Sequence, residues 1–189
     1  MRTFVAVKID VNRELKEFIN ELQLLLQDER IKWVNTDNFH LTLFFLGETA
    51  ESQINPIASV LRKIVEDYTR INLVLKGLGV FKNIRDPRVI WIGLSQNSVL
   101  QELHSRVQGS LVGQGYRKDD RPFRPHLTIG RPKRIYDQNR LSEVVEKNKN
   151  RYFQEVIIEE IVFYQSILKQ QGPEYCKIDK FNLKPLIPD

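Results

Sequence analysis

The sequence has few of the residues that cross-link small proteins or bind metals. Its 189 residues include one cysteine, Cys176, and three histidines. A single cysteine permits no internal disulfide, which suits a reducing compartment, and we expect a cytoplasmic protein. No His/Cys cluster has the spacing of a metal site, and no Asp-rich motif is present. The sequence therefore predicts neither a metal ion nor a cofactor.

Long apolar runs are also missing. No stretch approaches the roughly 20 apolar residues of a transmembrane helix. Arg2, Lys8 and Asp10 leave the N-terminal apolar run too short for a secretory signal. There is no Gly-rich phosphate loop, and no Gly-x-Ser-x-Gly elbow of the kind that serine hydrolases use. We expect a monomer that does not associate with membranes.

Two apolar segments, residues 39–46 and 125–130, carry the same polar pattern. Side chains alternate between the two faces of a strand, so a His-x-Thr places both polar groups on one face, about 7 Å apart. One such pattern is typical of the wet face of an edge strand. A repeat 86 residues away, using two of the three histidines, favours a function instead. The repeated residues are His40 and Thr42 in the first segment, and His126 and Thr128 in the second.

Paired imidazoles suit proton transfer, because the unperturbed pKa of histidine lies near neutrality. If the two strands face one cleft, one neutral imidazole can take a proton while one imidazolium gives one. Displacement at phosphorus needs both steps when the leaving group is a ribose oxygen. Thr42 and Thr128 would then hold the two non-bridging oxygens. This scheme requires no metal.

The excess positive charge is concentrated around the second segment. The chain has 29 Lys and Arg against 24 Asp and Glu, and residues 117–134 hold seven of the basic and two of the acidic residues. The remainder is therefore neutral, with 22 residues of each sign. A basic segment beside His126 favours a polyanionic partner, although it is also compatible with a solvated loop.

Hydrophobic periodicity predicts a mixed α+β fold. Helices are expected at about residues 12–27, 52–67, 98–112 and 137–147, and His104 lies on the apolar stripe of the third as a structural residue. Strands are expected at residues 3–9, 31–34, 39–46, 71–76, where Gly77 ends the strand, and 89–94, followed by the second motif strand, a long β-rich stretch at 153–168, and a hairpin strand at 174–183. No linker divides the chain, so we expect a single domain over residues 1–189.

The paired motifs resemble those of the 2H phosphoesterase superfamily, and within it the RNA 2′,3′-cyclic phosphodiesterase family, also called 2′-5′ RNA ligase-like proteins. Supporting segments run through most of the chain, namely residues 2–7, 32–34, 38–40, 88–94, 123–131, 166–168 and 172–175. The resemblance implies two pseudo-symmetric lobes, each an antiparallel sheet with helices outside, and an active cleft between them. It implies hydrolysis of RNA 2′,3′-cyclic phosphate ends to 2′-phosphates, with His40 as general acid and His126 as general base. The partner would be RNA or a nucleotide bearing that group.

Two details of the site stay open at this stage. Arg131 matches the family's phosphate-binding arginine, but simple alternation puts it on the face opposite His126 unless the strand bends near Gly130. For stacking on a nucleobase we expect Phe44, which shares the parity of His40, and Phe123. A non-catalytic nucleotide- or RNA-binding module and a 2′-5′ RNA ligase, which runs the reverse reaction, are the alternative functions.

Overall fold

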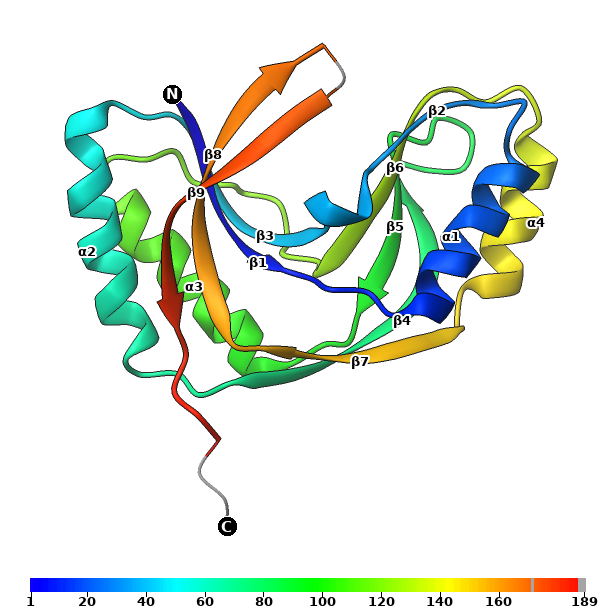
Figure 1. The fold of residues 1–189 in the computed structure, drawn as a ribbon. Helices are drawn as coiled ribbons and strands as arrows, with labels where there is room; N and C mark the ends of the chain where they lie inside the picture. The colour runs from blue at the N-terminus through cyan, green and yellow to red at the C-terminus, as the bar shows by residue number, and fades with distance from the viewer. Residues whose placement is uncertain (171, 187–189) are drawn as a thin grey trace.

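Two antiparallel sheets and four α-helices make up the part of the chain that the structure describes (Figure 1). This structure is a computed structural model, and it describes residues 1–170 and 172–186. Sheet A has the strand order β3-β1-β8-β9, and sheet B has the order β2-β6-β5-β4-β7. The expected α+β fold with two antiparallel sheets is confirmed.

Each sheet takes its strands from both ends of the chain. Sheet A contains β1 (Arg2–Lys8), β3 (His40–Glu48), β8 (Glu160–Lys169) and β9 (Gly172–Asn182). Sheet B contains β2 (Arg30–Trp33), β4 (Ile71–Phe81), β5 (Val89–Leu94), β6 (His126–Arg134) and β7 (Tyr152–Ile158). Neither sheet is therefore built from one continuous stretch of sequence.

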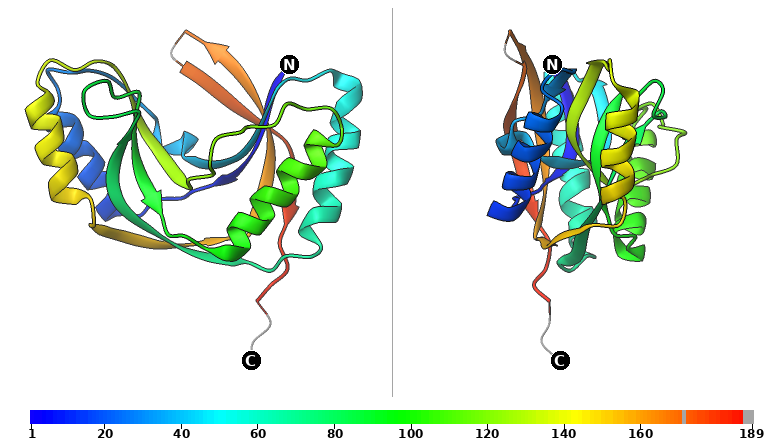
Figure 2. Two further views of the ribbon diagram at one scale, coloured as in Figure 1. Left: turned by 180° about the vertical axis from the view of Figure 1, so that it is seen from behind. Right: turned by 90° about the vertical axis from the view of Figure 1, so that its right-hand side faces the viewer.

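The helices lie at the two ends of the molecule (Figures 1 and 2). They are α1 (Arg13–Leu25), α2 (Ile54–Val65), α3 (Ser98–Val112) and α4 (Gln138–Asn148), with short 3₁₀ turns η1 (Thr36–Asn38) and η2 (Glu51–Gln53). Helices α2 and α3 pack against strands of sheet A, whereas α1 and α4 pack against strands of sheet B. Asn12, Asn97 and Asp137 cap three of these helices, because each side chain accepts a hydrogen bond from a backbone N–H in the first turn.

One continuous hydrophobic core joins the two sheets. It includes Val5 and Phe163 from sheet A and Leu75 and Leu127 from sheet B, none of which is more than 1% exposed. A smaller apolar cluster lies on the opposite face of sheet A and is formed by Phe4, Ala6, Val162 and Tyr164, with Tyr175 packed against it. Burial on both faces explains why β1 and the first half of β8 read as nearly continuous apolar runs.

Two of the expected strands were wrong in extent. Strand β4 does not end at Lys76 but continues to Phe81, because Gly77 adopts a φ of 80° and the register with β5 shifts between Leu75 and Leu78. A glycine at positive φ permits such a bulge without steric strain. The stretch at residues 153–168 is two strands, β7 and β8, that belong to different sheets.

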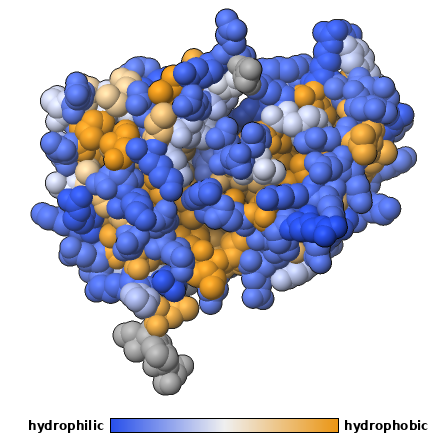
Figure 3. Space-filling model, in the orientation of Figure 1, coloured by the Kyte–Doolittle hydropathy of each residue, from blue (hydrophilic) through white to orange (hydrophobic). Residues whose placement is uncertain are grey.

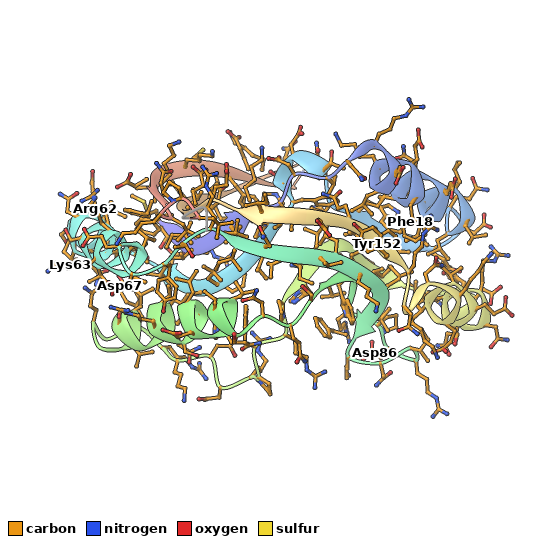
Figure 4. All side chains as sticks on the ribbon, turned by 90° about the horizontal axis from the view of Figure 1, so that it is seen from below. Phe18, Arg62, Lys63, Asp67, Asp86 and Tyr152 are labelled. Carbon is orange, nitrogen blue, oxygen red and sulfur yellow. The ribbon has the colours of Figure 1, made fainter. Side chains whose placement is uncertain are left out.

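The surface is mostly hydrophilic, with hydrophobic residues showing through in the middle of the face in Figure 3. Charged side chains project outward at the ends of the molecule, as Arg62 and Lys63 do from α2 in Figure 4. Among the described residues, none of the helices combines the length and the apolar character needed to cross a membrane.

Candidate active site

Strands β3 and β6 come from different sheets and lie next to one another, which brings the two motifs together (Figure 1). Nδ1 of His40 is 2.7 Å from the carbonyl oxygen of Asn38, and Nδ1 of His126 is 2.7 Å from that of Arg124. A carbonyl only accepts, so each Nδ1 carries the proton and donates it. In the neutral state, the Nε2 atom of each imidazole is therefore left with a lone pair and can accept a proton.

A bulge interrupts the alternation of β3 just after its His-x-Thr. Ala6 pairs with Thr42 and Val5 pairs with Phe44, so Leu43 is the extra residue. One extra residue reverses which side chains point to which face, and here the reversal holds for Phe44 and Phe45, up to a second register shift at Leu46. Phe44 therefore enters the core, where it is 3% exposed. Phe45 is 61% exposed and pairs with Phe4, on the face of sheet A that carries His40.

Strand β6 contains the same bulge at the same offset. Trp91 pairs with Thr128 and Ile90 pairs with Gly130, so Ile129 is the extra residue. Gly130 is buried against β2, whereas Arg131 is exposed. The burial patterns of β3 and β6 agree over their first seven positions. The structural repeat therefore extends beyond the two polar residues, and Phe45 and Arg131 occupy equivalent positions.

The bulges change two of the expectations drawn from simple alternation. Arg131 lies on the face of His126 and not on that of Leu127, and its positive charge lowers the pKa of both His40 and His126. The expectation that Phe44 shares the face of His40 was wrong, since Phe44 is buried on the opposite side.

Phe45 takes the place that Phe44 was expected to hold. Its ring centroid is 5.9 Å from that of Phe4, which in turn lies 5.1 Å from the His40 ring. No sequence argument that assumes strict alternation could have selected it. Aligning the two motif segments position by position would have matched Phe45 with Arg131.

Phe123 lies against α3. Its ring stacks on His104 with a centroid distance of 3.8 Å and an interplanar angle of 9°. Burial lowers the pKa of His104, and the nearby Asp119 carboxylate opposes that effect. One face of the Phe123 ring is therefore occupied within the protein, and contact of its other face with a nucleobase stays a prediction.

Each motif histidine meets an aromatic ring edge-on. Tyr175 lies 5.1 Å from His40 at 87°, and Phe81 lies 4.8 Å from His126 at 89°. These contacts restrict rotation of the imidazoles, and they repeat in both sheets. Sequence reasoning missed both residues, because Tyr175 lies on β9 and Phe81 follows Gly77, which was expected to end β4.

The electrostatic environment favours the neutral form of both imidazoles. Burial is the largest cause of the lowered pKa of His40, and the charges of Arg131 and His126 add to it. Burial also dominates for His126, with Arg131 and Arg121 adding to it. The hydrogen bonds to the Asn38 and Arg124 carbonyls act in the opposite direction. Thr42 and Thr128 are partly exposed on the same faces as the histidines.

A pocket of about 180 Å³ opens beside His40 on sheet A. It is lined by Lys8, Asp37, Asn38, Phe39, His40, Tyr164, Tyr175 and Lys177. Within the described residues, no group of three or more His, Cys, Asp or Glu side chains is arranged to hold a metal ion.

Comparison with known proteins agrees with this architecture. The family model of the 2′-5′ RNA ligase superfamily matches residues 11–169, and the chain belongs to this superfamily. A protein of Thermotoga maritima named RNA 2′,3′-cyclic phosphodiesterase is 36% identical over 178 residues, which cover 93% of this chain and 91% of that protein. A protein of the same name from Methanothermobacter thermautotrophicus is 30% identical, covering 97% and 99%. The resemblance noted in the sequence is confirmed.

Solved structures share the fold over nearly the whole chain. TT0787 of Thermus thermophilus superposes with a TM-score of 0.79 at 26% identity, covering 98% of this chain and 99% of its own. LigT of E. coli complexed with 3′-AMP superposes with a TM-score of 0.74 at 24% identity, covering 96% and 97%.

Proposed function

We propose that this protein hydrolyses RNA 2′,3′-cyclic phosphate ends to 2′-phosphates without a metal ion. The observation that carries the proposal is the matched pair of imidazoles, each donating Nδ1–H to a carbonyl two residues earlier and each within the field of Arg131. The names of the relatives at 30–36% identity support the same reaction. A single cysteine permits no internal disulfide, which is compatible with a location in the reducing cytoplasm.

The reaction exchanges one phosphorus–oxygen bond for another. Water attacks phosphorus and gives a proton to Nε2 of His126. The bond from phosphorus to the ribose O3′ breaks, and O3′ takes a proton from Nε2 of His40. The product is a ribose with a 2′-phosphate and a 3′-hydroxyl, and the enzyme returns to its starting state after one net proton exchange with solvent.

The assignment of the two roles follows the family resemblance, and charge supports it for His126. A base must be neutral, and Arg121 in the basic loop lowers the pKa of His126 but is not among the causes acting on His40. The acid must be protonated, although the pKa of His40 is lowered in the free protein. An anionic phosphate bound beside an imidazole favours its charged form, so substrate binding itself raises the pKa of His40.

Three further side chains would bind the phosphate. Thr42 and Thr128 present hydroxyls from the two motif strands, and Arg131 presents a guanidinium on the same side as His126. These groups would stabilise the charge that develops on the non-bridging oxygens. Phe45 offers an exposed ring next to Phe4 for stacking on the base.

Turnover of a panel of nucleoside 2′,3′-cyclic phosphates, with and without excess chelator, tests the proposal. We expect 2′-phosphate products and an unchanged rate in chelator. Loss of activity that a divalent ion restores would contradict the metal-independent mechanism. Binding without turnover would indicate a non-catalytic nucleotide-binding module, and joining of a 5′-hydroxyl RNA end would indicate a ligase.

A leaving group that needs no proton separates the two histidines. Each of His40→Ala and His126→Ala should lower the rate on cyclic phosphate by about 10²–10⁴. With a nitrophenyl phosphodiester of the nucleotide, His40→Ala should be much less damaging, while His126→Ala should remain damaging. The reverse pattern would exchange the roles, and full activity of both variants would refute the mechanism. His104→Ala, which changes the remaining histidine on α3, is the matched control.

A further inference from the structure

An uncompensated pair of positive charges lies beside the two-histidine site. Lys32 on β2 is paired directly with Arg131 on β6. Residues opposite one another in an antiparallel pair share a face, and like charges there are destabilising. Lys32 is exposed, and within residues 1–170 and 172–186 no carboxylate forms an ion pair with it. The pair is therefore not explained by the stability of the fold.

The Lys32 side chain spans from one sheet toward the other. A Cβ placed on Gly172, at the start of β9, would lie 3.4 Å from Lys32 Nζ. The same end of β9 is held against η1, because Asn38 Nδ2 donates to the carbonyl oxygen of Pro173 at 3.3 Å. Figure 1 shows the β8–β9 hairpin and β2 on either side of the middle of the molecule. The ammonium group therefore lies between the two sheets, on the side of the hairpin tip.

Lys32 and Arg131 differ in their effect on the pKa values of the two imidazoles. The charge of Arg131 lowers the pKa of both His40 and His126, whereas the charge of Lys32 is not a cause of either shift. The Lys32 ammonium instead lies beside the backbone of Gly172, at the start of β9. Its position is one strand away from Arg131, about 4.8 Å across the sheet. This places a second anion-binding group next to the first.

We propose that Lys32 binds the phosphate on the 5′ side of the reacting ribose, so that the site selects an RNA end over a free cyclic nucleoside phosphate. The inference rests on the proposed function and names its substrate more narrowly. An RNA chain carries its next phosphate on the 5′ oxygen of the terminal nucleotide, whereas a nucleoside 2′,3′-cyclic phosphate has none. Lysine acts as a point charge for such a group. Arg131 holds the cyclic phosphate, and Lys32 holds its neighbour.

Three substrates of one base isolate this contact. They are cytidine 2′,3′-cyclic phosphate, the same compound with a 5′-phosphate, and a short oligoribonucleotide ending in that cyclic nucleotide. For the wild type, kcat/KM should be higher on the second and third than on the first. In Lys32→Gln the ratio of kcat/KM between the oligonucleotide and the cyclic nucleoside phosphate should fall on the order of tenfold, as for the loss of one charged hydrogen bond. Lys32→Arg should restore most of that ratio.

Salt dependence and a remote lysine provide the controls. Loss of one phosphate contact should reduce the slope of log affinity against log salt by about 0.7 for single-stranded RNA. Lys63→Gln removes the same charge from the outer side of α2 (Figure 4) and should leave both the ratio and the slope at their wild-type values.

The outcomes separate this inference from the proposed function. If the wild type turns over none of the three substrates, the proposed function fails, and the inference fails with it. If the wild type is active and Lys32→Gln lowers kcat/KM equally on all three, Lys32 acts on the reacting phosphate and the inference is wrong. If Lys32→Gln and Lys63→Gln behave alike, only overall charge matters, and the inference is also wrong.

Discussion

Arg131 acts on two catalytic candidates at once. Its charge lowers the pKa of His40 from one sheet and of His126 from the other. The cation that we propose to bind the substrate phosphate therefore adds to burial in favouring the neutral form of both imidazoles. Binding of an anionic phosphate would offset this positive charge and raise the pKa values of His40 and His126.

Replacing Arg131 with glutamine tests this shared field. We expect the pKa values of His40 and His126 to rise in the free protein, because a positive neighbour is removed, and substrate binding to weaken by about 1.5–3 kcal/mol. An NMR titration resolves the three histidines, and His104 should not move, since the charge that acts on it is that of Asp119.

The control for this prediction lies on the same strand. Arg134→Gln removes a guanidinium that covers the Tyr136 ring at 4.9 Å, and neither motif histidine should respond to it. Unchanged histidine pKa values in Arg131→Gln, together with unchanged kinetics, would make Arg131 an ordinary surface residue.

At the scale of the strand, the two bulges decide which side chains reach the site. Because Leu43 is the extra residue of β3, adjacent phenylalanines face opposite ways. Phe44→Ala should destabilise the fold by about 3–5 kcal/mol, as expected for a large side chain removed from a core. Phe45→Ala should leave the urea midpoint nearly unchanged and raise KM, as expected for loss of a base-stacking ring.

Urea denaturation and steady-state kinetics on the same two variants supply the measurement, and each variant is the control for the other. Equal destabilisation by both substitutions would contradict the exposed position of Phe45. The reverse order, with Phe45 the more destabilising, would mean that the strand alternates without interruption.

The same bulges mark the limit of what the sequence could predict. The α3 boundaries, the α+β class and the polar faces of His40 and His126 follow from periodicity, since each depends on local spacing. Bulge positions depend on how a neighbouring strand pairs, which no local pattern records. For that reason, strict alternation assigned Phe44 to the wrong face. It also placed Arg131 on the face opposite His126, whereas the bulge in β6 puts both on one face.

Strand partnership was equally out of reach. Residues 153–168 read as one long β-rich stretch, yet β7 pairs with β4 in sheet B and β8 pairs with β1 in sheet A. Only the tertiary arrangement shows that Tyr175 and Phe81 meet the two histidines. Long-range pairing of this kind is set by the whole core and not by the propensity of either segment.

At the scale of the whole molecule, the histidines link stability to pH. The pKa values of His40, His104 and His126 all lie below the ordinary value of 6.5 for histidine, with burial as the largest cause. Between those lowered values and 6.5, the unfolded chain binds more protons than the folded one. The free energy of unfolding should therefore be highest above about pH 6.5 and fall as pH decreases through the folded-state pKa values.

Urea unfolding between about pH 7.5 and pH 5 measures this dependence. His40→Gln should make the curve shallower in that range, because one of the three linked groups is gone. Asp119, whose pKa is lowered to about 2 by its hydrogen bonds with Arg121, loses its contribution only at much lower pH. A free energy of unfolding that rises as pH decreases from 7.5 to 5 would contradict the assignment.

The interleaving of the two sheets has a consequence for how the molecule can be divided. A break in the loop between α3 and β6 would leave β1 and β3 in one fragment and β8 and β9 in the other, although all four form one sheet. Two strands alone are marginally stable at best. Each fragment would keep one His-x-Thr but not the sheet that supports it. The two matching halves of the sequence are thus not modules, and activity from a split gene would require both products in the same cell.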